Sequence, residues 1–167
     1  MGDSPRIIVG IGDIQDSVRP LLWAVNEARR RGAELHAVRA WHDRGDGLMS
    51  AETWRGLLAQ AAQQTIIASF EAAFGGVPRD IVIKMIDREG SPAVVLRHYA
   101  DGDDDMLVLG PSHRRRWWPF GGRVVRGCTQ NARCMVVVLP HAALATPVSR
   151  LLRELRRDMK RFERLGS

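Results

Sequence analysis

The run Arg6-Ile7-Ile8-Val9-Gly10-Ile11 decides the interpretation of this chain. It is rich in β-branched residues and reaches a glycine, as expected of a strand that is buried on both faces of a parallel sheet. Apolar side chains then recur at helical spacing over residues 17–31, with Ser17 as the expected N-cap, Pro20 near the first turn and Gly32 beyond the end. The chain therefore opens with a strand followed by a helix.

The same alternation continues to residue 139. Further strands are predicted at residues 35–41, 81–86, 106–109 and 135–139, and further helices at residues 50–74, 91–99 and 122–132. The order βαβαβαβαβ predicts an α/β fold, with a single doubly wound five-stranded parallel sheet and helices on both of its faces.

Glycines mark the ends of the first and fourth predicted strands. Gly10 and Gly12 follow the first strand, and Gly110 and then Gly121-Gly122 follow the fourth. Ligands in doubly wound sheets bind beyond the carboxyl ends of the strands, at the point where the strand order reverses. We therefore expect the order to reverse between these two strands, and we expect a cleft where their exits meet.

The composition suits one globular domain with an added tail. A length of 167 residues and an apolar share of 45% are enough for one hydrophobic core, so we predict an α/β domain at residues 1–140 and a linker with a helix at residues 141–167. No stretch approaches the roughly 20 apolar residues that span a bilayer, and no signal peptide is evident, so a cytoplasmic protein is expected. Cys128 and Cys134 lack C-x-x-C spacing and are expected to be buried thiols.

The tail predicted at residues 141–167 is basic and amphipathic, and it holds much of the net charge of +6. Its apolar residues alternate at spacings of four and three: Val148, Leu152, Leu155, Met159 and Phe162. We favour packing of this helix on the sheet domain or on a second subunit. Binding to an anionic membrane surface or to a partner protein remains an alternative.

Several fragments together resemble the universal stress protein pattern over about residues 6–140. They are Val9-Gly10-Ile11, Trp23-Ala24, Glu27-Ala28, Gly32-Ala33-Glu34-Leu35, Glu89-Gly90-Ser91-Pro92 and Leu107-Val108-Leu109-Gly110. The resemblance implies the strand order 3-2-1-4-5 and a homodimer formed through the fifth strands, here Val136, Val137 and Val138, with the C-terminal helix as a further contact. Some members of the family bind ATP, and others lack the motif and do not.

The ATP-binding members of the family carry an aspartate after the first strand. In this chain Gly12 holds that place and Asp13 follows it. Gly12 has no side chain that can accept a hydrogen bond, whereas Asp13 reaches a ribose hydroxyl only if the loop bends differently.

The second part of the family's motif is a glycine-containing loop after the fourth strand. Gly110 is retained, His113 replaces the second glycine, and Gly122 arrives one residue early with Arg123 in place of a hydroxyl residue. The arginine either fills the phosphate pocket or clamps a phosphate with a bidentate pair. The resemblance thus assigns a degenerate ATP-binding cleft to Ile11, Gly12, Asp13, Val38, Gly110, His113, Gly122, Arg123 and Val124.

The preferred interpretation is a non-enzymatic stress-response or regulatory protein, whose cleft either retains ATP or another adenine nucleotide or has lost it. Mg²⁺ is expected only together with ATP. No catalytic grouping is evident, and the histidines lack metal-ligand spacing. One alternative is an enzyme that hydrolyses ATP or transfers a nucleotidyl group, with Arg123 and His113 on the phosphates.

The cationic and aromatic loop Arg114–Phe120 suggests a further alternative, nucleic-acid binding together with the basic tail. We favour the simpler explanation, in which the aromatic side chains of this loop pack on the protein and its arginines are solvated. Nucleic-acid binding is the less favoured role.

Overall fold

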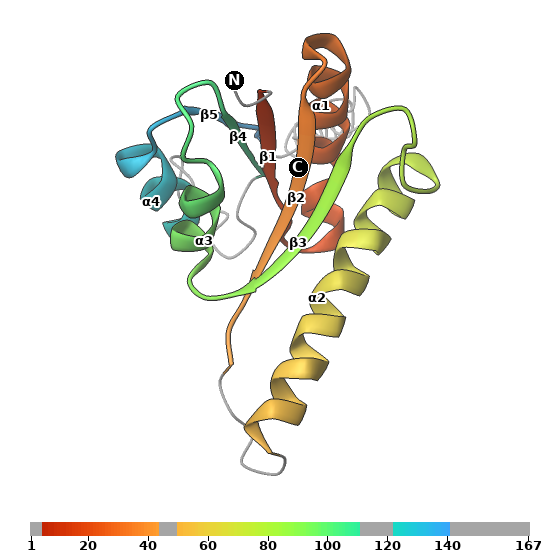
Figure 1. Cartoon of the computed structure of the whole chain (residues 1–167), viewed down its shortest axis with the longest axis vertical. Coiled ribbons are helices and arrows are strands. Elements are labelled where there is room, and N and C mark those ends of the chain that lie inside the picture. Colours follow the sequence, from red (N-terminus) through yellow and green to blue (C-terminus); the bar gives the residue numbers. More distant parts are fainter. Residues whose placement is uncertain (1–4, 44–49, 111–121, 141–167) are drawn as a thin grey trace, which may run out of the picture.

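The computed structural model of the chain describes residues 5–43, 50–110 and 122–140. Strands and helices alternate throughout these residues, as predicted (Figure 1). In chain order they are β1 (Arg6–Gly10), α1 (Ile14–Arg31), β2 (Glu34–Trp41), α2 (Ala51–Phe74), β3 (Ile83–Glu89), α3 (Pro92–Tyr99), β4 (Met106–Leu109), α4 (Arg123–Asn131) and β5 (Met135–Val138).

The five strands form one parallel sheet in the order β3-β2-β1-β4-β5. The central strand is β1, in which Ile8 lies opposite His36 of β2 and Leu107 of β4. The chain therefore winds outward in one direction from β1 to β3, and in the other from β4 to β5. The predicted fold class and the predicted reversal between the first and fourth strands are confirmed.

The two faces of the sheet are covered by different helices, which Figure 1 shows on opposite sides of the strands. On one face Ile7 and Val9 pack in a core cluster with residues of α1 and α2, and on the other Ile8 packs with residues of α3 and α4. All three side chains are at most 1% exposed. Burial of each such side chain stabilises the fold by about 1.5–3 kcal/mol, which is why β1 is apolar at consecutive positions.

Helix α1 begins earlier than the sequence pattern predicted. Its N-cap is Asp13, and Ser17 lies one turn inside the helix. The Ser17 hydroxyl accepts a hydrogen bond from the Gly12 N–H at 3.1 Å and donates to the Asp13 carbonyl at 2.9 Å, so it holds the preceding loop instead of capping the helix. At the other end, Gly32 adopts a left-handed conformation with φ 62°, as expected of a glycine that ends a helix.

Strand β3 is displaced toward the C-terminus from its predicted range of 81–86. Its last residues are polar but still pair with β2, up to Trp41 opposite Glu89. Asp87 is satisfied there, because it accepts hydrogen bonds from Trp41 Nε1 at 3.2 Å and from Gln63 Nε2 at 2.7 Å. A polar residue is tolerated in this strand because β3 is an edge strand and α2 supplies a donor.

Three predictions fall outside the described residues: the C-terminal helix within residues 141–167, the loop Arg114–Phe120, and the position of His113. Across residues 5–43, 50–110 and 122–140, none of the helices has both the length and the apolar character needed to cross a bilayer.

Candidate functional site

A pocket of about 300 Å³ lies at the carboxyl edge of the sheet, where β1 and β4 diverge. Its walls come from the ends of β1, β2 and β4 and from the starts of α1, α3 and α4. The pocket is lined by six of the nine residues that the family resemblance assigned to the cleft: Ile11, Gly12, Asp13, Val38, Gly110 and Val124. Gly122 and Arg123, the N-cap and first residue of α4, are not among its lining residues.

The pocket requires glycine at the end of β4. A Cβ atom on Gly110 would lie 2.9 Å from the Asp16 carbonyl oxygen and 2.9 Å from Pro20 Cγ. Atoms do not pack this closely, so the exit of β4 can pass the first turns of α1 only without a side chain. This close approach places the two exits of the strands beside one another.

The loop between β1 and α1 is held by hydrogen bonds within the protein. The Ile11 N–H donates to the Val38 carbonyl at 2.8 Å, and the Gly12 N–H donates to Ser17 Oγ at 3.1 Å. These two N–H groups are therefore engaged, so recognition by this part of the loop depends on side chains.

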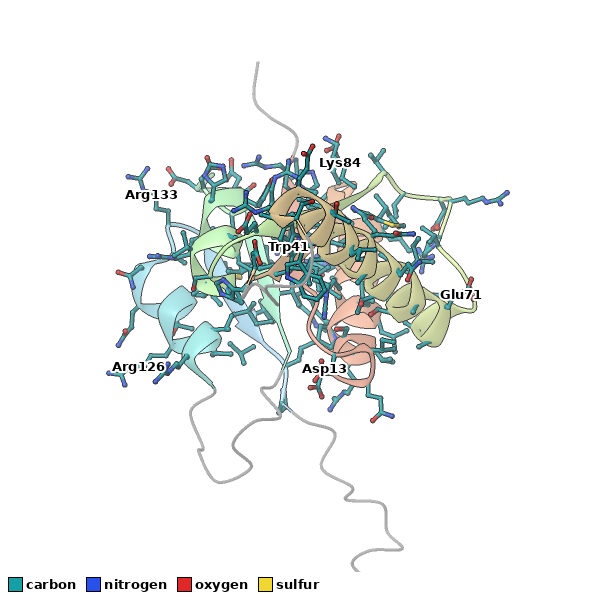
Figure 2. The ribbon with its side chains drawn as sticks, turned by 90° about the horizontal axis from the view of Figure 1, so that it is seen from below. Asp13, Trp41, Glu71, Lys84, Arg126 and Arg133 are labelled. Carbon is teal, nitrogen blue, oxygen red and sulfur yellow. The ribbon has the colours of Figure 1, made fainter. Side chains whose placement is uncertain are left out.

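Asp13 is the carboxylate of the loop that is open to a ligand. It occupies the N-cap position of α1, but its side chain makes no capping hydrogen bond. No described donor reaches this carboxylate, and the side chain lies at the edge of the molecule in Figure 2. An ionised carboxylate only accepts hydrogen bonds, so Asp13 is suited to hydroxyl or amino groups of a ligand.

Arg39, near the end of β2, also lines the pocket and was not identified from the sequence. Its Nη1 donates to the carbonyl oxygen of Gly12 and, at 3.5 Å, to that of Ile11. Burial lowers the pKa of the Arg39 guanidinium, and the charge of Asp13 partly opposes this shift. The available signal was a charged residue near the carboxyl end of an inner parallel strand, which is where such folds place their functional groups.

A second pocket, of about 430 Å³, lies at the opposite edge of the sheet and is larger. Two of its lining residues, Arg29 and Asp80, form a bidentate ion pair at 2.6 and 3.0 Å. Because these two charges already neutralise each other, and because ligands of doubly wound sheets bind at the carboxyl edge, we assign the functional site to the smaller pocket.

Two observations on the described residues concern nucleophiles and metal ligands. Burial raises the pKa of the Cys128 thiol to about 11, so this cysteine is a thiol at neutral pH. No group of three or more His, Cys, Asp or Glu side chains within these residues is arranged to hold a metal ion.

Solved structures of universal stress proteins share this fold. UspA from Lactobacillus plantarum is 20% identical with a TM-score of 0.63, and the match covers 83% of this chain and 99% of that one. A universal stress protein from Archaeoglobus fulgidus, solved in complex with dAMP, is 20% identical with a TM-score of 0.53, covering 83% and 98%. A family protein from Arabidopsis thaliana, solved with AMP bound, is 14% identical with a TM-score of 0.53, covering 86% and 98%.

At these levels of identity, the structural similarities show a shared fold and do not transfer a ligand. No curated protein matches the chain at a significant level. The sequence itself matches the universal stress protein family over residues 4–140. Since this match extends over most of the chain, the protein belongs to the universal stress protein family.

Proposed function

We propose that this protein is a non-enzymatic stress-response regulator that binds an adenine nucleotide in the carboxyl-edge pocket. Family membership supports the regulatory role, and relatives of the same fold have been solved with AMP and with dAMP. The observation that carries the proposal is the pocket between the exits of β1 and β4, with its apolar walls and its accessible carboxylate.

The walls of the pocket suit the parts of a nucleoside. Val38, Leu96 and Val124 are apolar residues that line the pocket, which suits a purine ring. The Asp13 carboxylate can accept hydrogen bonds from ribose hydroxyls, which is the role that the family's aspartate would have one residue earlier. A volume of about 300 Å³ is within the range of small-molecule sites.

The hydrogen bonds of Ser17 support binding without catalysis. Among the described residues, Ser17 is the one residue with a hydroxyl side chain that lines the pocket. Ser17 Oγ donates to the Asp13 carbonyl at 2.9 Å and accepts from the Gly12 N–H, so it is engaged in holding the loop. A serine nucleophile needs a neighbouring base that takes its proton, and Ser17 donates that proton to a carbonyl oxygen. Mg²⁺ belongs to this proposal only as a companion of ATP, whose phosphates would supply its ligands.

We also propose that the protein forms a homodimer through β5. This strand is an edge of the sheet, and its outermost residues Met135 and Val138 are 60% and 39% exposed. An apolar edge strand with free backbone groups readily pairs with a second chain. The central residues Val136 and Val137 pack on the two core clusters, so they hold the strand in place.

The nucleotide proposal is tested by calorimetric titration of the full chain with adenosine, AMP and ATP, the last with and without Mg²⁺. We expect AMP to bind. We also expect Asp13→Asn to weaken the binding of both adenosine and AMP by about tenfold, because the variant loses a charge-assisted hydrogen bond to the ribose. Asp104→Asn is the matched control, because Asp104 is an exposed aspartate remote from the pocket lining.

Two results would contradict the proposal. Absence of binding by all of these ligands at millimolar concentration would refute the nucleotide site. Hydrolysis of ATP by the purified chain, abolished by a substitution in the pocket, would refute the non-enzymatic role.

A further inference from the structure

Arg39 places a cation in the pocket at a position outside both parts of the family's nucleotide motif. It comes from β2, between Val38 and Ala40, which also line the pocket. We propose that Arg39 makes the pocket selective for anionic ligands by pairing with the phosphate group of a bound nucleotide. This inference rests on the proposed nucleotide-binding function.

The guanidinium of Arg39 is fixed at one end and open at the other. Its Nη1 is held by the carbonyl oxygens of Gly12 and Ile11. Among the described residues, no acceptor forms a hydrogen bond with its Nε or Nη2. A planar guanidinium that is already oriented, with two N–H positions unoccupied, can form a bidentate pair with a phosphate at little further cost in side-chain entropy.

The charge of Arg39 lacks a close counterion in the described part of the chain. Asp13 attracts it electrostatically, but no carboxylate oxygen of these residues forms an ion pair with it. Burial disfavours an isolated cation, so an incoming anion would relieve a cost that the free protein already carries.

The acidic residues near the pocket do not cancel this preference. Two aspartates line the pocket in the described residues, Asp13 and Asp16. Asp16 is half-buried but already has an interaction partner, and Asp13 is exposed to solvent, whereas Arg39 is half-buried. Solvent and salt screen exposed charges more strongly than buried ones, so the attraction of a phosphate to Arg39 outweighs its repulsion by Asp13 when the phosphate contacts the guanidinium directly.

The test compares AMP with adenosine, which lacks the phosphate, in titrations of the full chain and of the Arg39→Met variant. AMP should bind the unmodified protein about 10- to 100-fold more tightly than adenosine. Arg39→Met should abolish most of this preference, because loss of its contacts with the Gly12 and Ile11 carbonyl oxygens affects both ligands alike, whereas loss of the phosphate contact affects AMP alone. Arg39→Lys keeps the charge without the planar fork, and its preference should be intermediate.

Arg88→Met is the matched control, because it removes one positive charge at an exposed arginine that stacks on Tyr99 and does not line the pocket. This variant should keep the full preference for AMP. An equal loss of affinity for AMP and adenosine in Arg39→Met would overturn the inference, since Arg39 would then only position the loop. Tighter binding of both ligands would also overturn it, since Arg39 would then obstruct the pocket.

The outcomes separate this inference from the proposed function. If none of adenosine, AMP and ATP binds the unmodified protein, the nucleotide proposal and the role of Arg39 fail together. If AMP binds and Arg39→Met keeps the full preference over adenosine, only the role of Arg39 is refuted.

Discussion

Gly110 is the residue on which the geometry of the pocket depends most directly. Its missing side chain leaves room for the Asp16 carbonyl and for Pro20, each 2.9 Å from the position that a Cβ would take. Gly12 lies in the same pocket, but a Cβ there would meet no atom within 4 Å, and its φ is not positive. The two glycines therefore have different reasons to be present.

We predict that Gly110→Ala lowers the free energy of unfolding by about 1–3 kcal/mol, because the added methyl group pushes β4 away from α1. Gly12→Ala should change it by no more than about 0.5 kcal/mol, the range of most surface substitutions. Urea denaturation of the two variants would measure both values. Equal stability of the two variants would show that the exits of β1 and β4 are not closely packed.

At the scale of the element, the last turn of α1 is stabilised by ionic contacts. Glu27 accepts hydrogen bonds from Arg30 and Arg31, and these two arginines lower the pKa of Glu27 from 4.5 to about 2. Arginines at this end of the helix also interact favourably with its dipole. Since the pKa is lower in the folded state, the contribution to stability is complete above about pH 4.5 and disappears as the pH falls toward 2.

We predict that Glu27→Gln lowers the free energy of unfolding by up to about 1 kcal/mol at pH 7, because its partners Arg30 and Arg31 are exposed enough for solvent to screen the ion pairs. The difference from the unmodified protein should narrow between pH 4.5 and pH 2 in urea denaturation. Glu71→Gln is the control, because Glu71 forms no ion pair among the described residues. A difference for Glu27→Gln that stays constant down to pH 2 would contradict the assigned contacts.

Strand β5 is the second element whose role can be tested alone. We predict that the double substitution Met135→Lys and Val138→Lys weakens self-association by about tenfold or more, because like charges would face each other across paired strands. Both side chains are exposed and lie outside the core clusters, so the fold should be retained. Sedimentation velocity would measure the effect, with Val82→Lys, an exposed residue just before β3, as the control.

A protein that is monomeric at the same concentrations before substitution would contradict the proposed interface. So would a double variant that associates as strongly as the Val82→Lys control.

The elements that could be predicted from the sequence are those with buried apolar residues, and the errors lie where polar side chains find partners in the fold. The inner strands were predictable because burial on both faces requires consecutive apolar residues, as in β1 and β4. The helices were predictable because their apolar residues recur at helical spacing. The end of β3 was missed because an edge strand accepts polar residues, and Asp87 finds its donors on β2 and α2. The start of α1 was misplaced because the hydroxyl of Ser17 is taken by the loop instead of the helix terminus.

At the scale of the whole molecule, the position of the candidate site could be predicted and part of its chemistry could not. The glycines after β1 and β4 indicated where the strand order reverses, and that reversal determines where the pocket lies. Arg39 was not identified from the sequence because its place in the pocket depends on the direction of a half-buried side chain. Hydrogen bonds to the carbonyl oxygens of Ile11 and Gly12, in the loop after β1, set that direction. Contacts of this kind have no signature in residue spacing.

A crystal structure of the full chain grown with AMP would show whether the exits of β1 and β4 together form a nucleotide pocket. We expect AMP between the Gly12–Asp13 loop and Gly110, with its base against Val38, its ribose on Asp13 and its phosphate on Arg39. AMP bound at another surface, or a pocket filled by the protein's own side chains at saturating AMP, would contradict this expectation.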